Sequence, residues 1–286
     1  MRNFVRTGMR RWSMGFALSV LVTGIPLAAQ AEATYTAGVE ASYAPWAYVD
    51  HGEYKGIAID AMRAIAKAEG FKVKFKDLPF PSLIPALSTG KIDILVTGLT
   101  VTEKRSKVID FTIPWWETND VILVPKKSTL NIFTAVCCGA KIGVQGGSSQ
   151  QAWMDQNVVK PGKVDVTLAT YDSYETAVSD MLAGRLAAVD LDDTTAQTWI
   201  AKGRPIKSVG EIFIRAPMAL AVKKHDSRPV LAQLNKGIMA IAKSGEWQKI
   251  VHQYLPGVTI PPIPSTMPAY VDTYAKPVAG LPNLGN

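Results

Sequence analysis

Apolar side chains change their spacing repeatedly along residues 34–97, which predicts strands and helices in turn. Runs of the strand type, either apolar or alternating with polar residues, occupy residues 34–39, 71–76 and 92–97. Between these runs apolar side chains recur at helical spacing, and a glycine that can end a helix follows each segment, at Gly70 and Gly90. This alternation of strand and helix predicts a mainly parallel sheet covered by helices.

The same pattern returns over residues 141–189, which predicts a second unit of the same kind. Its strand-like runs occupy residues 141–144, 164–168 and 186–189. The junction of helix and strand at residues 87–92 recurs, one residue shorter, at residues 182–186. The chain is therefore expected to form two similar α/β lobes.

Two further apolar segments, residues 121–124 and 218–222, are interpreted as the crossings between the lobes. Helical patterns over residues 230–242 and 246–254 are expected to pack back on the first lobe. The fold class that follows is α/β, with two mainly parallel sheets joined by two crossing strands and a ligand cleft between the lobes. The expected organisation is lobe 1 at residues 32–122 and 221–255, lobe 2 at residues 123–220, and a Pro- and Gly-rich tail at residues 256–286.

The first 31 residues have the pattern of a secretory signal peptide. Four arginines precede an apolar run over residues 14–29, and Ala29-Gln30-Ala31 forms a small-x-small cleavage site. The run is interrupted by Gly24 and Pro26 and is shorter than the ~20 apolar residues of a spanning helix. Removal after Ala31 would place the mature chain in the periplasm. Arg10-Arg11 could mark the twin-arginine route, but the residues that follow fit that pattern poorly, which favours the general secretory route.

Charge and composition exclude several function classes. Beyond the signal peptide the chain has 27 basic and 24 acidic residues, a net charge of +3, with no basic run that would indicate nucleic-acid binding. Its three histidines are scattered, so we expect no metal site, no cofactor and no Ser-His-Asp catalytic residues. The two cysteines, Cys137 and Cys138, are adjacent, and a bond between neighbours would be strained, so we expect a pair of buried free thiols.

Polar residues follow the predicted strands, where open α/β sheets bind their ligands. Arg105, on a short helix capped by Thr102, could hold a carboxylate in a two-pronged hydrogen bond, or it could be a solvated helix arginine. After the strand that ends at Val189, Asp192 could bind an ammonium group, while Asp193 is expected to cap the next helix. Glycines at residues 146–147 allow close backbone approach to an anion or simply make a tight turn.

The sequence resembles the polar amino-acid-binding proteins that serve bacterial ATP-driven importers, solute-binding protein family 3. The resemblance covers Val39 to about Tyr254. It is carried by Glu40-x-x-Tyr43-Ala44-Pro45-Trp46, Gly56-Ile57-Ala58-Ile59-Asp60, Leu83-Ile84-Pro85-Ala86-Leu87, Thr100-Val101-Thr102-Glu103-Lys104-Arg105, Asp110-Phe111-Thr112 and Gly147-Ser148-Ser149. It implies a periplasmic-binding-protein-like fold of type II and a monomer that delivers a free amino acid to a membrane permease.

The resemblance also implies the roles of the site residues. Arg105, helped by Thr100 and Ser148, would bind the α-carboxylate of the ligand, and Asp192 would bind its α-ammonium group. The remaining implied ligand-binding residues are Thr97, Gly98, which offers backbone groups, Tyr43 and Phe80, which flank the ligand side chain, and Glu40, which contacts its tip. Trp46 is expected to pack in the core rather than on the ligand.

The sequence departs from the family pattern at several positions, and these departures leave the ligand open. Ala58 replaces a polar residue, Asp190 is an unusual aspartate, and Trp115-Trp116 is a bulky pair. A carboxylate at Glu40 favours a polar or basic amino acid, or an opine. The alternative is a periplasmic cyclohexadienyl dehydratase of the same fold, in which Glu40 or Asp190 would act as the catalytic acid.

Overall fold

The structure is a computed structural model that describes Met1 and residues 32–266. The predicted signal peptide and residues 267–286 of the predicted tail lie outside the described residues. No helix within the described part of the chain is long and apolar enough to cross a membrane.

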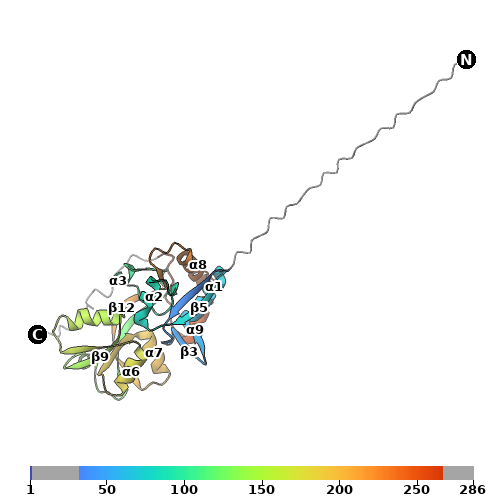
Figure 1. Ribbon diagram of the computed structural model, residues 1–286. Helices are drawn as coiled ribbons and strands as arrows, with labels where there is room; N and C mark the ends of the chain where they lie inside the picture. The colour runs from blue at the N-terminus through green and yellow to red at the C-terminus, as the bar shows by residue number, and fades with distance from the viewer. Residues whose placement is uncertain (2–31, 267–286) are drawn as a thin grey trace. The chain divides into compact units, whose positions relative to one another are not determined.

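The first lobe is built on a five-stranded sheet with the strand order β5-β1-β6-β13-β7. Figure 1 labels the edge strand β5 of this sheet. Strand β1 runs parallel to β5 and β6, whereas β13 runs antiparallel to β6 and β7. The strands are β1 (Thr34–Val39), β5 (Lys72–Asp77), β6 (Ile94–Leu95), β7 (Ile109–Phe111) and β13 (Ala221–Lys223).

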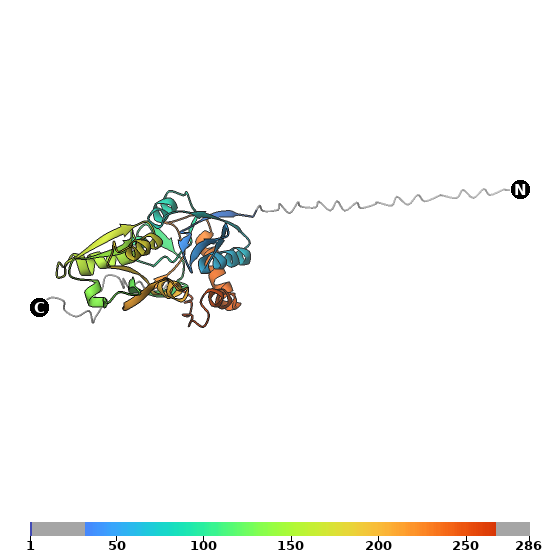
Figure 2. The ribbon, with the colours of Figure 1, turned by 90° about the horizontal axis from the view of Figure 1, so that it is seen from below.

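The helices of this lobe include the last two of the described chain. They are α1 (Ile57–Glu69), α2 (Phe80–Ser88), α3 (Glu103–Ser106), α8 (Val230–Lys243) and α9 (Glu246–Tyr254). Helices α8 and α9 lie beside α1 although they are far from it in sequence (Figure 2). Helix α1 ends as predicted, because Gly70 adopts a left-handed conformation and its N–H donates to Ala66 O.

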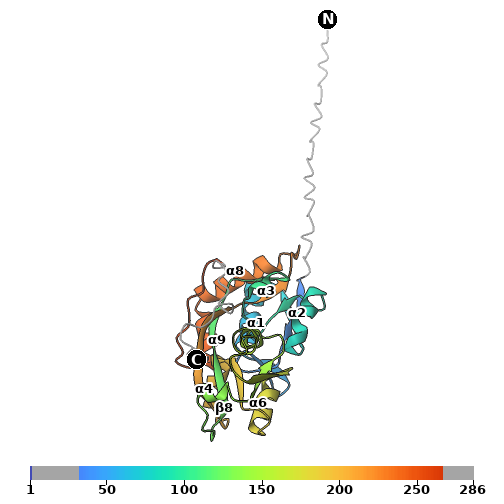
Figure 3. The same cartoon turned by 90° about the vertical axis from the view of Figure 1, so that its left-hand side faces the viewer.

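The second lobe is built on a five-stranded sheet with the order β10-β9-β11-β8-β12. Strand β9 runs parallel to β10 and β11, whereas β8 runs antiparallel to β11 and β12. The strands are β8 (Trp116–Pro125), β9 (Ala140–Gln145), β10 (Val166–Tyr171), β11 (Ala188–Asp192) and β12 (Ile206–Met218). Its helices are α4 (Ile132–Ala135), which lies beside β8 (Figure 3), α5 (Ser149–Met154) with a π-helical turn η1 (Asp155–Val159), α6 (Tyr174–Leu182) and α7 (Asp193–Ala201).

The predicted two-lobed α/β fold is confirmed, and both sheets are mixed. The chain passes from the first lobe to the second at residues 112–115 and returns at residues 219–220. The strands that follow these two passages, β8 and β13, run antiparallel to their neighbours. The first passage comes earlier than residues 121–124, because that apolar run forms the middle of β8.

A small three-stranded sheet places Tyr43 between the lobes. It consists of β2 (Ser42–Tyr43), β3 (Ala47–Asp50) and β4 (Glu53–Lys55), inserted between β1 and α1. Gly56 follows it with φ 124°, and a Cβ atom there would lie 2.3 Å from Trp46 O. Only glycine fits this position without strain, so the Gly56 motif has a structural role in holding the insertion against α1.

The expectation of buried free thiols is wrong. Cys137 and Cys138 form a disulfide in the turn between α4 and β9. Cys138 is exposed with φ 63°, and Ala140 N donates to Cys137 O at 3.0 Å. The tight turn brings both residues to the surface and not into the core.

Candidate functional site

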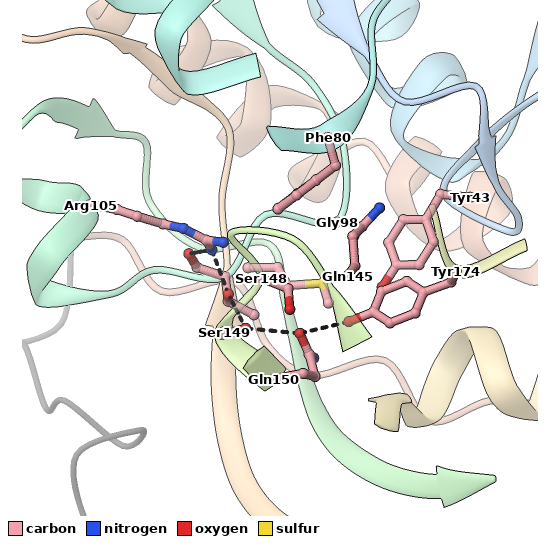
Figure 4. A pocket seen from close by; sticks show the side chains of 11 residues that line it. Tyr43, Phe80, Gly98, Arg105, Gln145, Ser148, Ser149, Gln150 and Tyr174 are labelled. Carbon is pink, nitrogen blue, oxygen red and sulfur yellow. Dashed lines mark hydrogen bonds between the residues drawn. The ribbon is translucent and has the colours of Figure 1, made fainter. Parts of the chain in front are cut away.

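A small pocket lies where the carboxyl ends of strands from both sheets meet (Figure 4). Six of the nine predicted site residues line it, namely Tyr43, Phe80, Gly98, Thr100, Arg105 and Ser148. Gln145, Ser149, Gln150, Tyr174 and Met218 complete the lining. The other three predicted residues, Glu40, Thr97 and Asp192, are buried and do not line it.

Arg105 is held rigidly at the pocket wall. Its backbone N–H donates to the capping hydroxyl of Thr102 at 3.2 Å, which begins α3. One guanidinium nitrogen donates to both Thr100 O and Thr100 Oγ1 at 2.7 Å, and the other donates to Gly147 O at 3.0 Å. The guanidinium carbon also lies 5.5 Å from the centre of the Phe80 ring. Only 7 % of Arg105 is exposed, so the alternative of a solvated helix arginine is wrong.

Hydroxyl groups and small residues surround this cation. Thr100 Oγ1 lies 2.9 Å from Ser149 Oγ, and Ser148 caps α5 by accepting a hydrogen bond from Gln151 N at 3.0 Å. A Cβ atom at Gly98 would lie 2.9 Å from a ring carbon of Tyr43, so this position needs glycine for close packing. The wall therefore offers a positive charge and small polar groups to an anion such as a carboxylate.

Asp192 supplies the opposite charge from the second lobe. It caps α7, because its Oδ1 accepts from Thr195 N at 2.9 Å while Oδ2 accepts from the Tyr43 hydroxyl. The prediction that Asp193 is the cap is wrong, since β11 ends at Asp192 and Asp193 is already helical. Burial raises the pKa of Asp192 to about 6, although the Tyr43 hydrogen bond opposes this shift. Asp192 is therefore largely ionised at neutral pH.

Glu40 lies at the end of β1 and is only 2 % exposed. Its Oε1 accepts from Gln145 Nε2 at 2.5 Å, while Oε2 has no partner among the described residues. Burial raises the pKa of Glu40 to about 8, and the hydrogen bond from Gln145 lowers it in part. Glu40 is a carboxyl group that a cation could readily ionise.

Hydrogen bonds join the two lobes across the pocket, so the described conformation is closed. They link Tyr43 to Asp192, Gln145 to Glu40, Arg105 to Gly147, and Thr100 to Ser149. Each involves a residue or motif that the sequence associates with the ligand. A ligand that enters must replace some of these contacts, since its charged groups would meet the same atoms.

The structure adds residues that the sequence did not single out as site residues. Tyr174 stacks on Tyr43 with ring centres 5.8 Å apart, and its hydroxyl donates to Gln150 Oε1 at 3.1 Å. Gln145 ends β9, so the rule of strand ends could have found it. Tyr174 begins α6, and in the sequence it belongs only to the apolar face of that helix, which indicates core packing and not a site. Trp46 is fully buried and packs edge-on against Trp116, as expected for a core residue. Among the described residues there is no group of acidic, His or Cys side chains suited to a metal ion.

Residues 35–257 match the family model for bacterial extracellular solute-binding proteins, family 3. The ABC transporter arginine-binding protein 1 of Escherichia coli strain K12 is 31 % identical over 247 residues, which cover 84 % of this chain and 98 % of the relative.

Solved structures show the same architecture. An ancestral arginine-binding protein bound to arginine has a TM-score of 0.71 and 33 % identity, over 78 % of this chain and 98 % of that one. An ancestral amino-acid-binding protein that is a precursor of cyclohexadienyl dehydratase has a TM-score of 0.68 and 28 % identity, over 77 % of this chain and 94 % of that one.

Proposed function

The chain belongs to family 3 of the bacterial extracellular solute-binding proteins, and from this premise we propose that it captures a free amino acid for an ABC importer. The observation that carries this proposal is a pair of opposite charges from the two lobes, one on the pocket wall and one directly behind it. Arg105 lies on the pocket wall. Asp192 lies behind the wall residue Tyr43 and accepts a hydrogen bond from its hydroxyl. A zwitterionic ligand has one carboxylate for Arg105 and one ammonium group for Asp192.

In this proposal the α-carboxylate lies between Arg105, Thr100 and Ser148, where the hydroxyl-rich wall is already built. The α-ammonium group replaces the Tyr43 hydroxyl at Asp192. Gly98 and Thr97 supply backbone groups beside it, and a side chain at Gly98 would collide with Tyr43.

The ligand side chain lies between aromatic rings and ends at a carboxyl group. Tyr43, Phe80 and Gln145 line the pocket, and the buried Glu40 lies behind Gln145, from which it accepts a hydrogen bond. A guanidinium or imidazolium group would gain from stacking and from ionising Glu40. We therefore propose a polar or basic amino acid, or an opine, over glutamate and aspartate. The relatives that are named arginine-binding proteins support a basic amino acid as the ligand.

The cellular setting follows from the same assignment. We propose that the signal peptide at residues 1–31 is removed, and that the mature chain works in the periplasm as a monomer. Its partner would be the membrane permease of the importer. Lobe closure on the ligand would give the permease a surface that differs from that of the open form.

A dehydratase on this fold is the rival function, and one structural neighbour is a dehydratase precursor. We propose binding without turnover, because Asp192 and Arg105 suit a zwitterion better than a dicarboxylate such as prephenate. A thermal-shift screen of amino acids and opines, with prephenate and arogenate turnover assayed alongside, tests this proposal. We expect strong stabilisation by one class of ligand and no turnover. Turnover, or stabilisation by prephenate alone, would contradict it.

A further inference from the structure

Three aspartates lie together on one face of the second sheet, behind the pocket. Asp192 on β11 is paired directly with Asp120 on the antiparallel strand β8, and Asp190 comes two residues before Asp192. Alternate residues of a strand point to the same face, and residues directly opposite each other in an antiparallel pair are neighbours on that face. All three side chains are completely shielded from solvent.

Most carboxylate oxygens of Asp120 and Asp190 have no hydrogen-bond partner. Asp120 Oδ1 accepts from Gln150 Nε2 at 2.7 Å. Asp120 Oδ2 and both oxygens of Asp190 have none within the described part of the chain. Ile122 lies opposite Asp190 on β8, so this carboxyl group has an apolar neighbour. A buried, unpaired carboxylate is very unfavourable, and such a group normally takes up a proton or a cation.

The described groups that act on the pair are acidic or neutral. Asp193 at the start of α7 adds a further acid, while α6 contributes Tyr174 and α5 contributes the neutral Gln150. Burial raises the pKa of Asp190 well above its ordinary value. Burial and the charge of Asp190 do the same for Asp120. Two such neighbours cannot both ionise without a cation nearby.

We propose that the Asp120–Asp190 pair holds a proton in the unliganded protein and releases it to solvent when the ligand's ammonium group binds at Asp192. The ammonium group, bound at Asp192, supplies the missing cation next to Asp120, which is the cross-strand partner of Asp192. The carboxylic O–H bond then breaks, the electron pair stays on the carboxylate, and water carries the proton away. This inference rests on the proposed function. Asp120 and Asp190 do not contact the ligand in this account and influence its binding only through Asp192.

Two consequences follow from the coupling. Binding that releases one proton strengthens up to tenfold for each unit of rising pH, because the deprotonated form binds. The pair also selects for ligands with an α-ammonium group, since a ligand without one leaves the buried acids neutral. Neither effect depends on the charge of the ligand side chain.

Calorimetry with L-arginine at pH 7.5, in two buffers of different ionisation enthalpy, measures the number of protons released. Every protein in the set carries Glu40→Gln, because Glu40 has its own raised pKa. Asp192, with a pKa of about 6, is mostly ionised at this pH and contributes little to the proton count. We expect release of roughly 0.5–1 proton from the parent. We expect the same from a matched Asp155→Asn control, which lies at the surface of the second lobe, and nearly none from Asp190→Asn.

A second measurement separates this inference from the proposed function. The infrared band of a protonated carboxyl group should be present in the ligand-free protein at pH 7.5 and lost in Asp190→Asn. If that variant does not fold by thermal melting, Asp120→Asn takes its place. Binding without proton release, or no such band, overturns the inference and leaves the proposed function intact. A band that is present in a protein that binds no amino acid overturns both.

Discussion

Replacing Glu40 with Gln should remove the preference for cationic ligands. The substitution keeps the shape of the side chain and the oxygen that accepts from Gln145 Nε2. It removes only the ability to become negative. The affinity ratio of L-arginine to L-glutamine therefore isolates the charge of Glu40, because both ligands share the α-carboxylate and the α-ammonium group.

The magnitude follows from two opposing terms. A guanidinium about 4 Å from an ionised Glu40 gains about 4 kcal/mol at an effective dielectric constant near 20. With a pKa of about 8, ionising Glu40 at pH 7 costs about 1.4 kcal/mol. The difference of about 2.6 kcal/mol corresponds to a fall in the ratio of roughly 50- to 100-fold in Glu40→Gln.

The pH dependence has a definite sign. Arginine binding requires ionised Glu40. The wild-type affinity ratio of L-arginine to L-glutamine should therefore rise between pH 6 and pH 8 and level off above the pKa of about 8. The ratio should be independent of pH in Glu40→Gln. Competition calorimetry gives both ratios, with Glu53→Gln, an exposed residue of the same lobe, as the control. A ratio that is unchanged by Glu40→Gln would refute this reasoning.

Three further predictions test the site and the fold. Arg105→Ala should weaken binding of every amino acid at least tenfold, because losing a buried charged partner costs about 2–5 kcal/mol; calorimetric affinity within threefold of wild type would show that the anchor is elsewhere. Small-angle scattering should give a smaller radius with saturating L-arginine, and an unchanged profile would count against closure. Gly56→Ala should lower the melting temperature by about 2–12 °C, since a Cβ would strain φ 124° and meet Trp46 O. Gly52→Ala, with no atom within 4 Å, should lower it less, and an equal fall would contradict the steric argument.

Much of the fold and several site residues were predictable because they depend on local pattern. Helical spacing and Gly70 located α1, and the rule of strand ends pointed to Arg105 and Asp192. That rule works because the carboxyl ends of neighbouring parallel strands share an edge, whatever the long-range details.

The remaining features depend on contacts that sequence spacing does not encode. The register between β8 and β11 places Asp120 opposite Asp192, and these residues are separated by 72 positions in sequence. The hydrogen bond of Tyr43 to Asp192 similarly depends on how the lobes meet. The disulfide of Cys137 and Cys138 depends on a local turn geometry that a mean Cα spacing could not reveal.

Equilibrium dialysis of the mature chain against labelled L-arginine, with unlabelled amino acids as competitors, tests the central claim most directly. The account predicts saturable binding of one ligand per chain, displaced by polar or basic amino acids and poorly displaced by glutamate. Loss of saturable binding in Arg105→Ala should accompany it. Absence of binding by any free amino acid, in a protein shown to be folded by thermal melting, would contradict the account.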